Sequence, residues 1–561
     1  MNKETQKSDV ILETKLKRKP KEESNIINRF SKNIFTSAIS LFLIKFLGFI
    51  YRAFLFNVDG YTDEANGYYS AGYEIYALIL AVIATGIPNI ISRITAEKIG
   101  KNKKDEAYKI FKTALKFFGF VSMGLAILLY FSADYIATKI YTIPQIALVI
   151  KVLSPAIFFV STSAIIRGHF TGMGNVKPSA SAQVIEQLLN CSLTILFAYM
   201  ASGRPPHIIA AAANVSTTVS VILSFTYLAI YFRKNKKKNR EVYKKVKINR
   251  DENRKILKEI LKIAVPITLA SFIGVFNMFI DSVTITRNLP KAFAGQNMGA
   301  EAIKSLSVKY LGLISKVNMI VTIPQIVSEA FANILITSVA YYTARGEKEK
   351  RAKNIIVSLK TLFMIIFPAM IGIIALANPI LHLIFPLAPD GGDLLGLYAV
   401  SGFLVSLNVV MNSALNGMGK VKIPPIIIFV SAVIKIALNL ILIPIPSINI
   451  YGSPIASIIS QGIICIITFL ILKHYSGSKF KSLKYILKIV LASALMGVVA
   501  YFTQGFLSKY IGGRISTLVS AFLAAIVYLL NIFALKAVSP EMVDKIPFVG
   551  KILNKKWERN R

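Results

Sequence analysis

The sequence has few of the residues that enzymes and metal proteins use for chemistry. It contains two cysteines, four histidines and one tryptophan in 561 residues. Cys191 and Cys465 both lie within apolar runs, which excludes a disulfide framework and a CxxC metal or redox site. P-loop, HExxH and GxSxG motifs are also missing, and no GxGxxG follows a strand. We therefore expect a protein that is not an enzyme, has no cofactor and is not driven by nucleotide hydrolysis.

Charged residues are scarce as well. They make up 17% of the chain, whereas hydrophobic residues make up 54%, and the mean hydropathy is positive. This composition is too apolar for a soluble protein of this length. Most of the chain must lie in lipid.

Apolar windows long enough to cross a bilayer recur along the chain. A helix needs about 20 apolar residues to span the hydrocarbon core. Fourteen such windows are present, which predicts an all-α polytopic membrane protein with 14 transmembrane helices. The eighth window is too long for one straight span and contains Pro324, so we expect it to be kinked or partly interfacial. The windows are 34–56, 68–92, 110–133, 147–167, 178–201, 207–232, 262–285, 306–340, 354–380, 394–416, 423–445, 451–472, 482–504 and 515–537.

The positive charges alternate between the connections of these windows. The net charge is +38, which in a soluble protein would point to nucleic acid. Here 50 Lys and Arg residues lie in one alternating set of connections and tails, and seven lie in the other set. This is the positive-inside rule, so we expect both termini in the cytoplasm and no nucleic-acid partner.

An internal repeat divides the chain into two lobes. GMGNVKPSA at 172–180 resembles GMGKVKIPP at 417–425, and two further matches precede them at nearly the same offset. The offset contains six helices, so the halves are parallel copies. The GMGxVK segments themselves are typical of a helix–helix turn. The predicted parts are a basic cytoplasmic tail 1–33, an N-lobe 34–232, a basic cytoplasmic linker 233–261, a C-lobe 262–473, an additional helix pair 474–540 and a basic tail 541–561.

Two basic residues of the 34–56 helix are candidates for binding an anion. Lys45 lies near the expected bilayer midplane, where an isolated charge costs at least about 2.5–3.5 kcal/mol. Arg52 follows two turns later on the same face. We expect this face to bind phosphate, with Lys316 and Arg287 completing a basic rim from the second lobe. The alternative is that Lys45 and Arg52 each pair with a buried acid, for which the candidates are Glu74, Glu186 and Glu329.

Lys435 is a second buried cation. It lies near mid-depth of the 423–445 helix, one turn before Asn439 on the same face. The 262–285 helix carries a polar series of Ser271, Asn277 and Asp281. Pairing of Lys435 with Asp281 or with nearby amide oxygens is expected.

Several motifs give the chain a family resemblance. They are KFLGFIYRAFLF at 45–56, TGIPNIISRITAEKIGKNKKDEA from Thr85, the two GMGxVK turns and YLGLISKVNMIVTIPQ from Tyr310. On these the chain resembles the MOP flippase superfamily, in its polysaccharide transporter, SpoVB-like and MurJ-like lipid II flippase branch. The resemblance covers roughly residues 34–540.

The resemblance implies two V-shaped lobes that alternate between inward and outward access. MurJ-like members carry basic residues in the central cavity. Lys45, Arg52 and Lys316 match such positions, Arg52 after a shift of one residue, whereas YALILAVIATG has no counterpart of a further arginine. The last two helices would flank a groove for the polyprenyl tail. Some members bind sodium in the second lobe, and Lys435 would replace that ion and couple transport to protons. A permanent ion pair that only holds the lobe together is the alternative.

The resulting hypothesis is a flippase in a bacterial cell membrane. It would move a polyprenyl-diphosphate-linked saccharide, the peptidoglycan precursor lipid II first of all, from the inner to the outer leaflet. The diphosphate would bind Lys45 and Arg52. Ions or the membrane potential would drive transport, membrane lipids and cell-wall synthesis proteins would be its partners, and it would act as a monomer. The alternatives are a flippase for a capsule or teichoic glycan, a cation-coupled multidrug exporter and a membrane glycosyltransferase or polymerase; the last has no paired-carboxylate cluster in its outer connections.

Overall fold

The computed structural model describes residues 46–81, 86–238, 250–294, 298–477 and 483–537. These residues form an all-helical fold, and no strand occurs within the described ranges. The predicted tails 1–33 and 541–561 lie outside the described residues, as does Lys45. The predicted fold class, an all-α membrane protein, is confirmed.

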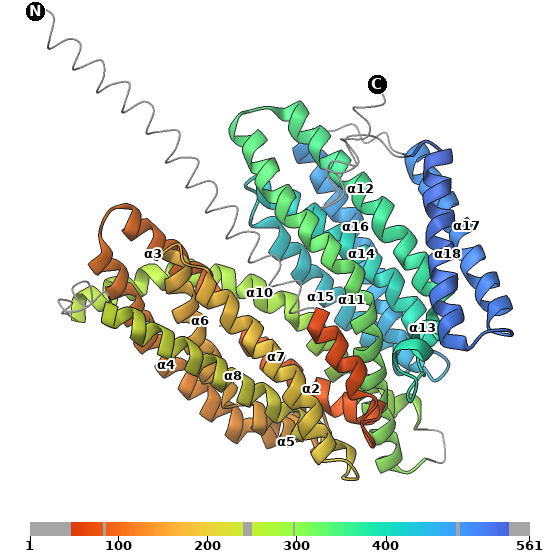
Figure 1. Cartoon of the computed structure of the whole chain (residues 1–561), viewed down its shortest axis with the longest axis horizontal. Helices are drawn as coiled ribbons and strands as arrows, with labels where there is room; N and C mark the ends of the chain where they lie inside the picture. Colours follow the sequence, from red (N-terminus) through yellow and green to blue (C-terminus); the bar gives the residue numbers. More distant parts are fainter. Residues whose placement is uncertain (1–45, 82–85, 239–249, 295–297, 478–482, 538–561) are drawn as a thin grey trace, which may run out of the picture.

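The first group of helices forms the N-lobe (Figure 1). The start of its helix α2 is capped, because the Thr62 side chain accepts a hydrogen bond from the Ala65 N–H and two acidic residues occupy the first turn. In chain order the helices are the segment Phe46–Leu55, α2 Asp63–Leu80, α3 Gly86–Gly100, α4 Lys104–Tyr135 with a π-helical end Ile136–Ile140, α5 Ile146–Leu153, α6 Ala156–Gly172, α7 Lys177–Met200 and α8 Pro206–Lys238.

The second group forms the C-lobe, and a final pair packs on its outside (Figure 1). The long helix α10 contacts α2, α3 and α4 of the first group as well as α11 and α15 of the second. The helices are α10 Arg250–Ala292, α11 Ala300–Ala344, α12 Lys348–Ala375, α13 Ala377–Ile384, α14 Gly392–Gly417, α15 Ile423–Leu442, a short 3₁₀ turn Asn449–Tyr451, α16 Gly452–Ser476, α17 Leu483–Leu507 and α18 Gly513–Ala534.

Ten helices of the described part are long and apolar enough to cross a membrane. The total of fourteen stays a prediction. Window 68–92 corresponds to parts of α2 and α3, because α2 already begins at Asp63 and α3 extends to Gly100. The eighth window is one helix, α11, with Pro324 inside it. The predicted linker 233–261 is mostly helical where described, since α8 continues to Lys238 and α10 begins at Arg250.

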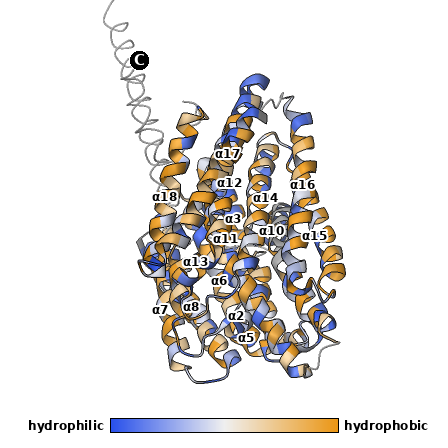
Figure 2. Cartoon of the chain, turned by 90° about the vertical axis from the view of Figure 1, so that its right-hand side faces the viewer, coloured by the Kyte–Doolittle hydropathy of each residue, from blue (hydrophilic) through white to orange (hydrophobic). Residues whose placement is uncertain are grey.

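The surface of the molecule fits a lipid environment. Figure 2 shows hydrophobic residues along the lengths of the C-lobe helices and hydrophilic residues gathered near their ends. Large apolar side chains of α15, α17 and α18 are exposed, among them Phe429, Phe502 and Phe522. Exposed apolar surface on this scale indicates contact with lipid. A separate cluster of buried residues joins α17 and α18 to α12.

The repeat is visible in the two GMGxVK turns. Met173 N–H donates to the His169 carbonyl, and Met418 N–H donates to that of Ala414. The following bonds also correspond, with Asn175 N–H on Phe170 and Lys420 N–H on Leu415, both at 3.0 Å. Gly174 and Gly419 adopt φ angles of 76° and 78°, which glycine tolerates best. The two segments are therefore equivalent helix–helix turns, as the sequence indicated.

Candidate functional site

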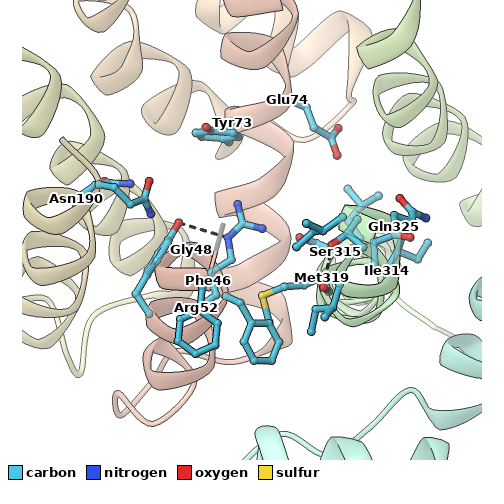
Figure 3. Close-up of a pocket in the computed structure, with 18 of the residues that line it drawn as sticks. Phe46, Gly48, Arg52, Tyr73, Glu74, Asn190, Ile314, Ser315, Met319 and Gln325 are labelled. Carbon is cyan, nitrogen blue, oxygen red and sulfur yellow. Dashed lines mark hydrogen bonds between the residues drawn. The ribbon is translucent and has the colours of Figure 1, made fainter. Parts of the chain in front are cut away.

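A cavity of about 560 Å³ lies between the two lobes. Residues of the 46–55 segment, α2 and α7 line one side of it, and residues of α10 and α11 line the other. Figure 3 shows Asn190 and Tyr73 from the first set facing Ser315, Met319 and Gln325 of α11. A mixed lining of amides, hydroxyls and apolar side chains suits a ligand with both polar and apolar parts.

Arg52 is the one basic residue among the described residues that line this cavity. Its Nε donates a 3.3 Å hydrogen bond to the Tyr51 hydroxyl, and its guanidinium carbon lies 5.8 Å from the centre of the Tyr69 ring. The hydroxyls of Tyr51 and Tyr69 are 3.2 Å apart. These contacts orient the guanidinium, which projects into the space between α7 and α11 (Figure 3). A guanidinium held in this way presents its remaining N–H groups to an anionic ligand.

Three acidic residues also line the cavity, namely Glu74, Asp281 and Glu329. The sequence indicated a more basic cavity, because Lys45, Lys316 and Arg287 were expected to line it together with Arg52. Two intramembrane lysines, Lys316 and Lys435, have buried carboxylate partners and are not among the lining residues. The described lining is thus mixed in charge.

Lys316 is fully buried where the lobes meet. Its Nζ lies 2.7 Å from the Asp63 carboxylate and donates a 2.6 Å hydrogen bond to the Ala388 carbonyl. The rings of Phe56 and Phe385 lie 5.4 Å and 5.7 Å from the ammonium. This position joins α11 to the start of α2. Lys316 therefore makes a contact between the two lobes. Its role in substrate binding stays a prediction.

Two equivalent glycines let α2 and α11 cross closely at the same place. A Cβ on Gly67 would lie 2.0 Å from the Val308 carbonyl oxygen, and one on Gly312 would lie 1.7 Å from that of Asp63. The Asn66 side chain adds a 2.8 Å hydrogen bond to the Gly312 carbonyl. Gly67 and Gly312 are separated by the repeat offset, and so are their partners Asp63 and Val308, so the two contacts are equivalent and the crossing lies on the axis that relates the lobes. The helix bundles of the two lobes lie together at this crossing and diverge toward the opposite end of the molecule (Figure 1).

Arg287 lies outside the cavity. Its Nε donates a 3.0 Å hydrogen bond to the Ile140 carbonyl, and its guanidinium also donates to the Lys139 carbonyl. It is exposed and is not one of the cavity-lining residues. Arg287 therefore joins α10 to the end of the α4 hairpin, and its assignment to a substrate-binding rim stays a prediction.

Lys435 and Asp281 form a buried ion pair beside the cavity. The Lys435 Nζ is 2.6 Å from Asp281 Oδ2, and Asn439 Nδ2 donates a 3.0 Å hydrogen bond to Asp281 Oδ1. Asn439 also donates to the Thr284 hydroxyl at 2.9 Å. The three predicted residues are thus in contact and join α10 to α15. Their role in coupling stays a prediction, while the predicted partners Ser271 and Asn277 have side chains outside the described part.

Sequence reasoning missed the aromatic wall around Arg52. Tyr69, Tyr73 and Tyr76 occupy one face of α2, with the rings of Tyr69 and Tyr73 stacked at 6.3 Å. The run YYSAGYEIY at 68–76 carries the signal, because residues spaced by three and four share a helix face. Its chemical role could not be recognised without knowing that Arg52 lies against this face.

A second hollow of about 1260 Å³ lies between α17 and the α12–α14 region. Its lining includes Tyr501, Phe502 and Phe506 on one side and Ile374 and Leu397 on the other. This hollow shares no lining residue with the central cavity. The additional helix pair therefore borders a largely apolar groove, where the family resemblance led us to expect one.

Two family models match the chain. The model described as polysaccharide biosynthesis protein matches residues 30–341, which is more than half of the chain. The MatE model matches residues 302–441.

Curated relatives match along most of the chain. The lipid II flippase MurJ of Bacillus subtilis (strain 168) is 25% identical over 525 residues, covering 89% of this chain and 93% of the relative. Stage V sporulation protein B of the same organism is 20% identical over 523 residues, covering 91% and 96%. These matches extend over both lobes and the additional helices.

Solved structures share the fold. The lipid II flippase MurJ in an inward closed conformation has a TM-score of 0.67 at 18% identity, covering 90% of this chain and all of that one. An inward-facing multidrug resistance MATE family transporter of the MOP superfamily has a TM-score of 0.61 at 17% identity, covering 78% of this chain and 98% of the other. The architecture of two lobes around a central cavity is therefore that of these transporters.

Proposed function

Because the chain belongs to the polysaccharide biosynthesis protein family, within the MOP superfamily, we propose that it is a flippase for a polyprenyl-diphosphate-linked saccharide in a bacterial cell membrane. The observation that carries this proposal is Arg52, a guanidinium oriented by tyrosines inside a cavity between two lobes. A diphosphate is the ligand group that such a guanidinium binds best, because it offers several charged acceptor oxygens.

The rest of the cavity suits the saccharide. Gln187 and Asn190 of α7 and Ser315 and Asn318 of α11 line it from opposite sides. Amides and hydroxyls are donors and acceptors for sugar hydroxyls. The lipid tail remains outside, and the groove beside α17 offers it an apolar surface. Transport then consists of binding, a change of access and release, with no covalent step.

The charge distribution supports a cavity that opens to the cytoplasm. The α2–α11 crossing lies near the lysine-poor connections 57–67 and 381–393, which the positive-inside rule assigns to the outer face. The open end then faces the cytoplasm, where lipid-linked precursors are made. Lipid II is the substrate that the similarity to MurJ favours. A capsule-type or teichoic-type lipid-linked glycan carries the same diphosphate and is the alternative.

One observation favours a second candidate function. Glu74, Asp281 and Glu329 give the cavity carboxyl groups, and carboxylates attract cations. A cation-coupled exporter of cationic drugs would use such a lining, and the MATE transporters share this fold. Arg52 argues against it, because a cation would have to approach an oriented guanidinium.

Binding to the purified protein separates these functions. Native mass spectrometry would compare lipid II, polyprenyl monophosphate and a cationic dye. We expect lipid II to bind, and Arg52→Ala to weaken binding about 10-fold to 100-fold, because a charge-assisted contact contributes about 1.5–3 kcal/mol. Arg204→Ala is the matched control, because it removes an exposed arginine from the connection between α7 and α8 that lines neither the central cavity nor the α17 groove. Binding of the dye but not of lipid II, or equal binding by Arg52→Ala, would contradict the proposal.

A further inference from the structure

Glu74 is a carboxyl group in the middle of the membrane-spanning part that neither the anion site nor the ion pair uses. It lies about three turns after the start of α2, which is about 16 Å along the helix. It lines the central cavity, and Figure 3 shows its carboxyl group projecting away from α2 toward the α11 side. The Ser282 side chain hydrogen bonds to the carboxyl group, whereas Glu74 Oε2 has no hydrogen-bond partner among the described residues.

The groups that act on Glu74 belong to the opposite lobe and to the cavity wall. Asp281 of α10 and Lys435 of α15 are the charged groups near it. The titratable hydroxyls are those of Tyr141 and Tyr398. Tyr141 donates to the Ala71 carbonyl at 3.1 Å, and the Tyr398 hydroxyl is 2.9 Å from that of Ser453, so both already have partners.

The charges near Glu74 balance without it. The Lys435 ammonium and the Asp281 carboxylate form a neutral pair, and Asn439 donates to the second oxygen of that carboxylate. A charged Glu74 would add one negative charge beside Asp281 at mid-membrane depth. An extra charge there is costly, and a proton removes the cost.

We propose that Glu74 is the proton-binding site through which this transporter couples proton uptake to the change of access. Lys435 keeps its counter-ion, and the proton resides on Glu74 while α2 lies against α10. The proposal rests on the proposed function only in taking the two lobes to exchange access. Because Glu74 belongs to α2 and its neighbours Ser282 and Asp281 belong to α10, a relative movement of the lobes changes its surroundings. A site whose proton affinity differs between two conformations necessarily shifts their populations with pH.

The sign of the effect follows from the same contacts. In the arrangement seen here Glu74 faces a carboxylate and has one oxygen without a partner, which favours the protonated form. When the lobes separate at this depth, water reaches the carboxyl group and favours its charged form. Low pH should therefore populate the arrangement seen here, and high pH should populate the alternate one.

Spin labels on the two diverging ends measure this shift without any substrate. The labels replace Lys101 at the α3–α4 turn and Lys348 at the α11–α12 turn, both exposed, after Cys191 and Cys465 have been changed to alanine. Distances between the labels are measured in liposomes by pulsed electron resonance between about pH 5 and pH 9. We expect the long-distance population to fall as pH rises. Glu74→Gln should abolish this pH dependence and keep the long distance, whereas Glu74→Asp should preserve a titration.

A control on the same helix makes the result specific. Glu64→Gln changes a carboxyl group at the start of α2 that does not line the cavity. The distances between the labels in this variant should depend on pH as they do in the parent protein. Distances that do not depend on pH in the parent, or pH dependence that persists in Glu74→Gln, would overturn the proposal. If no lipid-linked saccharide binds but the Glu74-dependent shift is present, the proposed substrate is wrong and the proton site stands.

Discussion

Arg52 and Lys316 are both positively charged residues within the membrane-spanning part, but their surroundings differ. Arg52 lines the cavity, and its Nε donates to the Tyr51 hydroxyl, an arrangement that suits a residue that binds a ligand. Lys316 has a carboxylate at 2.7 Å and a carbonyl at 2.6 Å and is fully buried. Both are intramembrane cations in the sequence, and only their tertiary contacts distinguish the candidate binding residue from the contact between lobes.

The sequence could predict a partner for Lys435 and could not predict one for Lys316. A lysine at mid-depth needs a counter-ion, and Asp281 was the acidic member of a polar series on a helix expected in the same lobe. Asp63 belongs to the other lobe, at the edge of an apolar window, where an acid is ordinarily solvated. Its contact with Lys316 depends on how the lobes dock, which periodicity does not report.

The Lys435–Asp281 pair leads to a prediction about stability. Lys435→Met should leave a buried carboxylate without its counter-ion and lower the free energy of unfolding by about 3–5 kcal/mol. Asp281→Asn should have a similar effect, and the double variant should recover part of the loss because no isolated charge remains. Thermal unfolding of the purified protein measures all three variants. Losses that simply add in the double variant would show that the two groups do not act as a pair.

The same pair predicts that transport does not require sodium. The Lys435 ammonium lies 2.6 Å from Asp281 Oδ2, so this carboxylate has a counter-ion within the protein. Flipping in liposomes at fixed membrane potential should therefore be equal in sodium and in potassium buffers. A several-fold loss of rate without sodium would refute this replacement.

At the scale of elements, the crossing of α2 and α11 is the close contact that holds the two lobes together at one end of the molecule. Gly67 and Gly312 permit backbone contact there, and the Asp63–Lys316 pair lies beside them. The sequence predicted the repeat and the helix–helix turns, because both are local patterns. It could not show that Gly67 packs against α11 and Gly312 against α2, since these contacts are made between the lobes.

Gly67→Ala tests whether α2 and α11 are in backbone contact at this crossing. The added methyl group would overlap the Val308 carbonyl, and overpacking of this kind costs about 1–3 kcal/mol. Gly396→Ala on α14 is the matched control, because a Cβ there meets no atom within 4 Å. We expect a lower unfolding temperature for Gly67→Ala alone. Equal unfolding temperatures for the two variants would contradict the close crossing.

For the whole molecule, composition and periodicity were enough to predict the fold class. The number of membrane spans is harder to predict from them. Ten described helices satisfy length and hydropathy, whereas α2 begins with Asp63 and Glu64 and carries Glu74 at mid-length. Asp63 contacts Lys316 of the other lobe, and Glu74 lines the cavity. Two of the acids that make α2 hard to recognise as a span thus belong to the contact between lobes and to the candidate site.

Topology gives a prediction at this scale. Single cysteines at Asp59 and Asp390 should react with an impermeant thiol reagent added outside intact cells, and those at Lys237 and Lys348 should not. All four positions are exposed in the structure, so a lack of labelling reflects the membrane and not burial. Labelling after permeabilisation shows that each cysteine is reactive. The opposite pattern at any position would refute the predicted orientation of the lobes.

The central claim, that the cavity around Arg52 carries lipid-linked saccharides across the membrane, is tested most directly by flipping in reconstituted vesicles. Fluorescent lipid II and a lipid-linked glycan of capsule type are compared in vesicles with the parent protein, with Arg52→Ala and without protein. We predict that the parent protein accelerates flipping of at least one of these diphosphate lipids, and that Arg52→Ala lowers its rate about 10-fold or more. Flipping at the protein-free rate for every lipid, or an unchanged rate in Arg52→Ala, would contradict the account.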